Sequence, residues 1–278
     1  MGSPRGQLLM SYFVPNGSYL MELAEEGSNA SQVTALQAIG KTIVEDLRAD
    51  AVIIASPHWQ PKSQFFVDAG DLHESFHDYV LRPAPFGRRF FTYVAPGDPF
   101  LAGAMLDTGR AAGVKVAHKQ YGLDHGAFCP LKVMGIRLPT VPISVSRRSV
   151  NECLEWGAAI RRAVEESGKR VVLIAPGNLC HRLDLRTEKQ TDDYFTDGVE
   201  FDRQAIELVT SGRTRDLEKI DRRLWTAVAP EADCRPLFII AGASGDAPGR
   251  LMQYQGAIYS VGDATFAFET ASTDKVLA

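Results

Sequence analysis

The chain has 278 residues, of which 45% are hydrophobic and 23% are charged, and its formal net charge is −4. This composition excludes a disordered chain, a collagen-like repeat and a coiled coil. The charge balance is unlike that of a nucleic-acid-binding protein, and no apolar run is long enough for a transmembrane helix. The first ten residues lack the apolar core of a signal peptide. Four scattered cysteines without a CxxC pair favour reduced thiols. We therefore expect a cytoplasmic protein with no membrane or nucleic-acid partner.

The first half of the chain alternates strand-like and helix-like segments. The continuous apolar run at residues 51–55 is typical of a strand buried on both faces. Residues 69–97 contain several prolines and aromatic residues, which predicts a long loop with one short helix. The aromatic side chains of this segment could cover a binding pocket, or they could belong to the ordinary packing of a long loop. The other expected elements are strands at residues 7–13 and 64–67, the latter beside 51–55, and helices at 31–48 and 99–113.

The second half continues the alternation. A capping box at Ser149 and Glu152 begins a helix that should end near Ser167. The run at 236–241 could be helix or strand, and 256–268 predicts a hairpin or two edge strands. The other expected elements are strands at 141–145 and 170–175 and helices from 130, at 196–211 and at 215–228. The pattern predicts an α/β fold, with residues 1–278 in a single domain and a largely parallel or mixed sheet covered by helices on both faces.

Three of the six histidines stand where such folds place ligand sites. His58 follows the strand at 51–55 by three residues, and His181 follows the strand at 170–175 by six. Ligands of open α/β sheets bind at the carboxyl ends of the strands. His125 lies in the segment Gly-Leu-Asp-His-Gly, whose glycines permit a sharp turn and a close approach. The three histidines are therefore candidate site residues, although each alone could be an ordinary loop histidine.

The segment from His73 to His77 matches H-E-x-x-H, the signature of zinc proteases. That chemistry needs a stable helix that places both histidines on one face. A Gly-Asp pair precedes the segment and a proline-rich stretch follows it. We therefore favour a polar loop near the site over a metalloprotease.

Four motifs, taken in order, resemble one family. They are Ser-Pro-His-Trp at 56–59, Gly-Leu-Asp-His-Gly at 122–126 followed by Pro-Leu, Val-Pro-Ile-Ser-Val-Ser at 141–146, and Gly-Asn-Leu-Cys-His-Arg-Leu at 177–183. In this order and spacing they resemble the class III extradiol ring-cleavage dioxygenases, which include protocatechuate 4,5-dioxygenase and 2-aminophenol 1,6-dioxygenase. The resemblance extends from about residue 9 to residue 268.

The resemblance implies a site in which Fe(II) is held by two histidines and one carboxylate, and in which an aromatic substrate and O₂ bind to the metal. His58 resembles the second ligand histidine of the family. His181 resembles its acid–base histidine, and His125 resembles the histidine that lies over substrate and oxygen. The carboxylate ligand aligns with Glu231, and Asp233 is the alternative if the loop is one residue shorter.

The chain departs from the family at the first ligand. Asn16 occupies the place of the first histidine, and an amide oxygen is a poorer Fe(II) ligand than imidazole. One interpretation is an active dioxygenase for a catechol or 2-aminophenol. It would hold Fe(II), or another divalent ion, with His58, Glu231 and either Asn16 or a water. The alternative is a non-catalytic α-type subunit of a heteromeric dioxygenase, without a metal. Nothing positive supports a third possibility, a metal-free binding or hydrolytic protein. The family implies a homo-oligomer or a heteromer.

Overall fold

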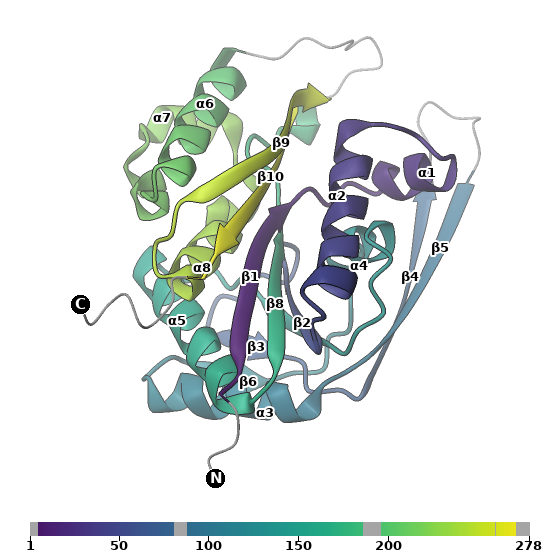
Figure 1. The fold of residues 1–278 in the computed structure, drawn as a ribbon. Helices are drawn as coiled ribbons and strands as arrows, with labels where there is room; N and C mark the ends of the chain where they lie inside the picture. The colour runs from purple at the N-terminus through teal and green to yellow at the C-terminus, as the bar shows by residue number, and fades with distance from the viewer. Residues whose placement is uncertain (1–4, 81–87, 186–195, 259, 271–278) are drawn as a thin grey trace.

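The computed structural model describes residues 5–80, 88–185, 196–258 and 260–270. Eight of its strands form one sheet in the order β6-β3-β7-β2-β8-β1-β10-β9 (Figure 1). Parallel and antiparallel pairs both occur, so the expected α/β fold with a mixed sheet is confirmed. The strands of this sheet are β1 (Gln7–Val14), β2 (Ala51–Ser56), β3 (Phe65–Val67), β6 (Val116–His118), β7 (Thr140–Ser144), β8 (Arg170–Pro176), β9 (Gly249–Ile258) and β10 (Val261–Glu269).

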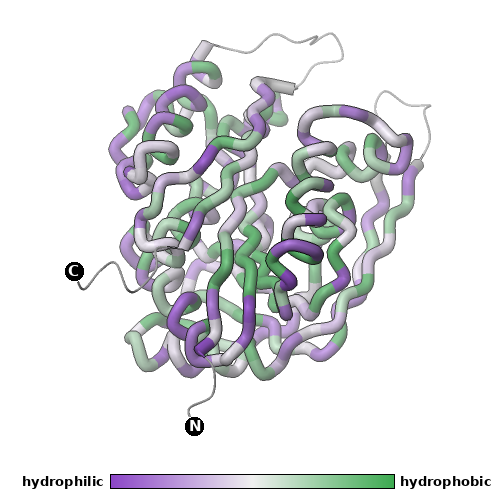
Figure 2. The backbone as a smooth tube through the Cα atoms, viewed as in Figure 1, coloured by the Kyte–Doolittle hydropathy of each residue, from purple (hydrophilic) through white to green (hydrophobic). Residues whose placement is uncertain are grey.

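The middle of the sheet is parallel. β2 pairs in parallel with β7 and with β8, and β8 pairs in parallel with β1. All six residues of β2 are buried, which explains its continuous apolar run at 51–55. Figure 2 shows hydrophobic residues concentrated along these central strands and polar residues on the outer helices. Parallel neighbours place their carboxyl ends on one edge of the sheet, and the candidate residues Asn16, His58 and His181 follow those ends.

Helices cover both faces of the sheet, as expected. Successive residues of β8 point to opposite faces, so Leu173 joins the core beneath α3, α5 and α8, whereas Ile174 joins the core beneath α1, α2 and α4. α6 packs against β9 and α7. The helices are α1 (Tyr19–Glu25), α2 (Ser31–Lys41), α3 (Pro99–Ala111), α4 (His125–Val133), α5 (Val150–Ser167), α6 (Thr196–Thr210), α7 (Arg222–Val228) and α8 (Arg235–Ser244).

The ends of α3 and α5 lie where the capping residues in the sequence predicted them. The Asp98 side chain caps α3 by accepting the Leu101 N–H at 3.0 Å. Ser149 and Glu152 form the predicted capping box of α5, which ends at Gly168 with φ of 73°. The ambiguous run at 236–241 lies in helix α8, and residues 256–268 belong to the hairpin of β9 and β10.

Several expectations were wrong. Residues 69–97 do not form a loop with a short helix: β4 (Leu72–Val80) and β5 (Arg88–Pro96) form an antiparallel ribbon (Figure 1). β3 pairs with β6 and β7 rather than with β2. α4 begins at His125, not at Pro130, and the segment 215–228 is a 3₁₀ turn followed by α7. Phe86, one of the aromatic residues of the segment 69–97 that could cover a pocket, lies outside the described residues.

The ribbon also excludes a zinc-protease helix at the H-E-x-x-H segment, because His73 and His77 lie on a strand. Side chains alternate along a strand, so both histidines point to the inner face and Phe76 points outward. His73 is buried, whereas Phe76 is 68% exposed. Within the described part of the chain, no helix is long and apolar enough to cross a membrane.

Candidate functional site

Three neighbouring parallel strands deliver one polar side chain each to the candidate site. Asn16 follows the end of β1 by two residues, His58 follows β2 by two, and Asn178 follows β8 by two. Because β2, β8 and β1 are adjacent in the sheet, the three side chains converge at one edge.

These side chains meet around the carboxylate of Glu231. The His58 Nε2 lies 3.1 Å from Glu231 Oε1, and the Asn16 Nδ2 donates to the same oxygen at 3.1 Å. The Asn178 Nδ2 donates to Glu231 Oε2 at 2.8 Å and to Asn16 Oδ1 at 3.0 Å. Asn16, Asn178 and Glu231 are all buried. The structure therefore brings together all three residues that the sequence assigned to a metal, and adds Asn178.

An unusual turn presents Glu231. The next three residues, Ala232, Asp233 and Cys234, have φ of 49°, 51° and 56°. Left-handed backbone costs about 1–2 kcal/mol for each residue that is not glycine, so this conformation must be held by its surroundings. Asp233 points away from the site and pairs with Arg235 at 2.7 Å. Of the two alternative carboxylates, only Glu231 joins the cluster.

His58 lies between two carboxylates. Its Nε2 faces Glu231, and its Nδ1 lies 3.6 Å from Asp124 Oδ1. Burial acts to lower the pKa of His58, but hydrogen bonding to the two carboxylates and their charges outweigh burial and raise the pKa to about 10. With these neighbours, His58 is an imidazolium at neutral pH. Its side chain remains 32% exposed, so solvent reaches the cluster.

The segment Gly-Leu-Asp-His-Gly fixes Asp124 and His125. Asp124 caps α4 through the Ala127 N–H at 3.1 Å and accepts the hydroxyl of Ser56 at 2.5 Å. Gly122 has φ of 79°, which few other residues tolerate. A Cβ on Gly126 would lie 2.7 Å from His58 Nδ1, so a side chain there would displace the histidine.

His125 lies between two other imidazoles, with the His77 ring stacked on it and the His58 ring tilted against it. Its ring centroid lies 4.4 Å from that of His58 and 4.4 Å from that of His77. Burial, together with the charges of His58 and His77, lowers the pKa of His125 to about 4. His125 is therefore neutral at physiological pH and can both donate and accept a hydrogen bond.

The sequence motifs did not place His77 in the site. The ribbon brings it there: Ser75 on the same face donates to the Leu123 carbonyl, and the His77 Nε2 lies 2.9 Å from the Ser18 hydroxyl. Burial lowers the pKa of His77. The only sequence signal was the spacing of the two histidines in the H-E-x-x-H segment.

His181 lies on a well-anchored segment beside the cluster. Its N–H donates to the Val228 carbonyl at 3.0 Å, and it forms an isolated bridge with Val261. Burial acts to raise the pKa of Glu231, but the hydrogen bond from His58 and the charges of His181 and His58 outweigh burial and lower it. Glu231 is therefore ionised at neutral pH, and His181 is close enough to influence it.

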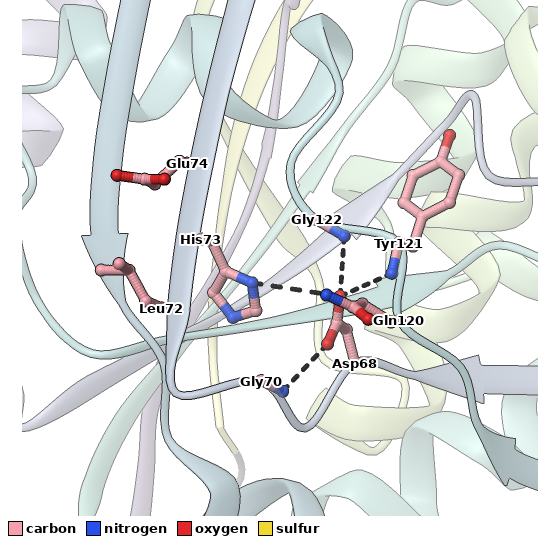
Figure 3. A pocket seen from close by; sticks show the side chains of 8 residues that line it. All are labelled: Asp68, Gly70, Leu72, His73, Glu74, Gln120, Tyr121 and Gly122. Carbon is pink, nitrogen blue, oxygen red and sulfur yellow. Dashed lines mark hydrogen bonds and ion pairs between the residues drawn. The ribbon is translucent and has the colours of Figure 1, made fainter.

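A pocket of about 310 Å³ adjoins the loop that carries Asp124. Figure 3 shows that Asp68 holds this loop through the N–H groups of Tyr121 and Gly122, both at 2.7 Å. Tyr121 in turn donates its hydroxyl to Asp124 at 2.8 Å. None of the candidate site residues lines this pocket, whose walls are Asp68, Gly70, Leu72, His73, Glu74, Gln120, Tyr121 and Gly122.

The side chains around Glu231 can be compared with the ligands that a divalent metal ion requires. Among the described residues, no group of three His, Cys, Asp or Glu side chains is arranged to hold a metal ion. However, the His58 Nε2 and the Asn16 Nδ2 both lie 3.1 Å from Glu231 Oε1. Adjacent ligands of an ion bound at about 2.1 Å lie about 3 Å apart. Asp124 at the far nitrogen of His58 is the carboxylate partner that metal-binding histidines usually have. The residues therefore fit a divalent ion if the Asn16 amide turns so that its Oδ1 takes the place of Nδ2.

The strand ends of this α/β sheet thus carry a histidine–carboxylate cluster flanked by further histidines. Residues 12–269 match the model of the catalytic LigB subunit of aromatic ring-opening dioxygenases. The chain belongs to this LigB family.

Curated proteins that are similar to this chain carry dioxygenase names, which is consistent with membership of the LigB family. The chain is 28% identical to a 4,5-DOPA dioxygenase extradiol of Beta vulgaris, over 78% of this chain and 82% of that protein. It is 28% identical to a 3,4-dihydroxyphenylacetate 2,3-dioxygenase of Escherichia coli, over 69% of this chain and 71% of that protein. It is 26% identical to the 2-aminophenol 1,6-dioxygenase beta subunit of a Pseudomonas species, over 63% of this chain and 62% of that protein. An uncharacterized protein of Escherichia coli K12 has the same fold, with a TM-score of 0.70 and 19% identity over 94% of this chain and 99% of that one.

Proposed function

We propose that this chain is an extradiol ring-opening dioxygenase for a catechol or a 2-aminophenol, with Fe(II) or another divalent ion held by His58, Glu231 and Asn16. The observation that carries the proposal is the position of His58, with one nitrogen toward Glu231 and the other toward Asp124. This is the arrangement in which a carboxylate orients a histidine ligand. A metal bound there would supply a Lewis acid that two adjacent oxygen or nitrogen atoms of a substrate can chelate.

The protein residues have separate roles in this proposal. Asp124 fixes the ring of His58, and the ionised Glu231 supplies negative charge. His125, neutral because its pKa is lowered to about 4, can accept a hydrogen bond from a substrate hydroxyl at a ring nitrogen. His181, next to Glu231, can exchange a proton with the substrate at a ring nitrogen. Histidine suits proton transfer near neutral pH.

A second function is favoured by Asn16. In the metal-free protein its amide donates to Glu231 at 3.1 Å, where the resemblance places a ligand histidine. If the site does not bind a metal, the chain is a non-catalytic α-type subunit that assembles with an active homologue. Oligomerisation with itself or with such a homologue is part of the proposal in either case.

The deciding experiment is anaerobic titration of the purified chain with Fe(II), followed by addition of O₂ and a panel of catechols and 2-aminophenols. O₂ consumption and the absorbance of the ring-opened product report turnover. We expect about one Fe(II) per chain. His181→Ala and His125→Ala should abolish turnover, whereas His118→Ala, an exposed histidine on the edge strand β6, should retain it.

Two results would argue against the first proposal. Unchanged ring cleavage by His181→Ala would remove that residue from the site. Failure of the wild-type chain to bind any divalent ion would favour the non-catalytic subunit, and co-purification with a homologous chain would then be the next observation to seek.

A further inference from the structure

The carboxylate of Asp124, which faces the outer nitrogen of His58, is held by donors from the protein. Its Oδ2 accepts the hydroxyl of Tyr121 at 2.8 Å and the hydroxyl of Ser56 at 2.5 Å. Its Oδ1 accepts the Ala127 N–H at 3.1 Å but lies 3.6 Å from the His58 Nδ1, which is longer than an ordinary hydrogen bond. The two hydroxyls and the N–H therefore set the orientation of this carboxylate, and His58 meets a partner that is already fixed.

Tyr121 is itself fixed at three points. Its N–H donates to Asp68 at 2.7 Å (Figure 3). Its ring stacks on the indole of Trp59, with the centroids 4.3 Å apart and the planes 4° from parallel. Trp59 is buried and directly follows His58 in the chain. The hydroxyl on Asp124 is the third point, so the position of the Tyr121 oxygen is well defined.

The charges suit a lasting hydrogen bond from Tyr121 to Asp124. Burial, the charge of Asp124 and the hydrogen bond to it raise the pKa of Tyr121, so its hydroxyl stays protonated at neutral pH. Burial acts to raise the pKa of Asp124, but hydrogen bonds from His58 and Ser56 and the charge of His58 outweigh burial and lower it. The acceptor is therefore ionised, and hydrogen bonds to ionised acceptors are stronger than those between neutral groups.

We propose that Tyr121 is a positioning residue, whose hydroxyl acts through Asp124 to fix the ring of His58 in the candidate site. A ring whose outer nitrogen faces a fixed carboxylate keeps its inner nitrogen directed at Glu231, 3.1 Å away. The inference rests on the proposed function and deepens it, because it names a residue outside the cluster that controls how firmly the same site holds a metal.

The first test measures Fe(II) binding to the full chain by anaerobic calorimetry. Tyr121→Phe removes the hydroxyl and keeps the ring on Trp59. It should weaken Fe(II) binding about 3- to 10-fold, less than the 10- to 100-fold typical of a residue that contacts a ligand directly, because Tyr121 is one contact further away. If the hydroxyl only draws charge from Asp124, affinity rises instead, and if Tyr121 acts only through its ring, affinity is unchanged. Either of these two results would overturn the inference.

A double-mutant cycle tests whether the effect passes through Asp124. In the Asp124→Ala background, Tyr121→Phe should have no further effect on Fe(II) affinity, because its only route to His58 is gone. The lost cap of α4 is common to both members of that comparison and cancels. Additive losses would overturn the inference. Tyr93→Phe is the matched control: it removes a hydroxyl that donates to the Ile136 carbonyl at 2.6 Å and should bind Fe(II) like the wild type.

A measurement without added metal separates this inference from the proposed function. Nuclear magnetic resonance of the full chain with isotope-labelled histidine reports the ring nitrogens of His58, identified by their loss in His58→Gln. Tyr121→Phe should shift these signals in the wild-type background and leave them in place in the Asp124→Ala background. Unchanged signals in Tyr121→Phe would overturn the inference even if the chain binds Fe(II). Shifted signals in a chain that binds no divalent ion would refute the proposed function and leave the inference standing.

Discussion

The imidazole rings of His77 and His125 stack with their centroids 4.4 Å apart and their planes inclined by 15°. The first ring comes from a separate two-stranded ribbon and the second from the start of α4. The ribbon is therefore part of the candidate site and not only a cover for it.

This contact predicts the effect of removing the His77 ring. Stacked aromatic pairs contribute about 0.5–1.5 kcal/mol, so His77→Ala should lower kcat/KM for a cleaved catechol by about 2- to 10-fold. His77→Phe keeps a flat ring and should retain more activity than His77→Ala. Steady-state kinetics with the iron-loaded chain provide the measurement. Phe76→Ser, on the outward face of the same strand, is the matched control. Equal kinetics for the wild type and His77→Ala would contradict the role of the stack.

Asp124 should control metal affinity without contacting the metal. Asp124→Asn keeps an oxygen that can cap α4 but removes the charge that orients His58. Such changes typically cost 10- to 100-fold in metal affinity, so we expect a loss of about that size in an anaerobic Fe(II) titration. Asp68→Asn alters a second buried aspartate of the same region that does not contact His58. It should lower the stability of the fold and leave Fe(II) affinity intact. A comparable loss of affinity in both variants would show that the effect is indirect.

Asp202 should make the stability of the fold depend on pH. Burial raises its pKa from 3.8 to about 7, despite hydrogen bonds from the Cys180 N–H and the Tyr254 hydroxyl. The folded state therefore favours the protonated carboxyl. The protonated Asp202 carboxyl adds most to the free energy of unfolding below about pH 4, and this addition is lost as the pH rises to about 7. Urea unfolding at several pH values should show this loss in the wild type and a smaller one in Asp202→Asn. Identical pH profiles would contradict the assignment.

The left-handed turn after Glu231 predicts a stabilising substitution. At Ala232, φ is 49°. Glycine relieves a cost of about 1–2 kcal/mol there but loses about 0.5–1 kcal/mol of backbone entropy on folding. We expect Ala232→Gly to raise the free energy of unfolding by about 0.5–1 kcal/mol in urea. Ala104→Gly, in the middle of α3, should lower it by about 1 kcal/mol. A loss of stability in both variants would mean that the turn is not strained.

The sequence predicted the central strands because β2 and β8 contain continuous apolar runs at 51–55 and 171–175. It predicted the ends of α3 and α5 because their caps are strong local signals. It could not predict the ribbon. The inner face of β4 carries His73, Ser75 and His77, and its outer face carries exposed Phe76, so the usual alternation of apolar inside and polar outside is reversed.

Part of the site was equally beyond sequence reasoning. His58, His125 and Glu231 could be proposed from motifs, and the structure brings them together with Asn16. The motif at 177–183 contains Asn178 but assigns it no role, and only the structure shows that its amide contacts Glu231. His77 joins the site through strand pairing between residues distant from the other motifs, which no local pattern encodes.

The position of β1 in the sheet determines when the candidate site can form during translation. This strand is translated before the other strands of the sheet, yet it lies between β8 and β10, which begin at residues 170 and 261. Asn16 therefore has neither sheet neighbour until most of the chain has been translated, and Glu231 also arrives late. Local helices can form during synthesis, but the cluster can assemble only after Glu231 has been translated. Truncated translation products would lack the cluster, so they could not sequester metal through it.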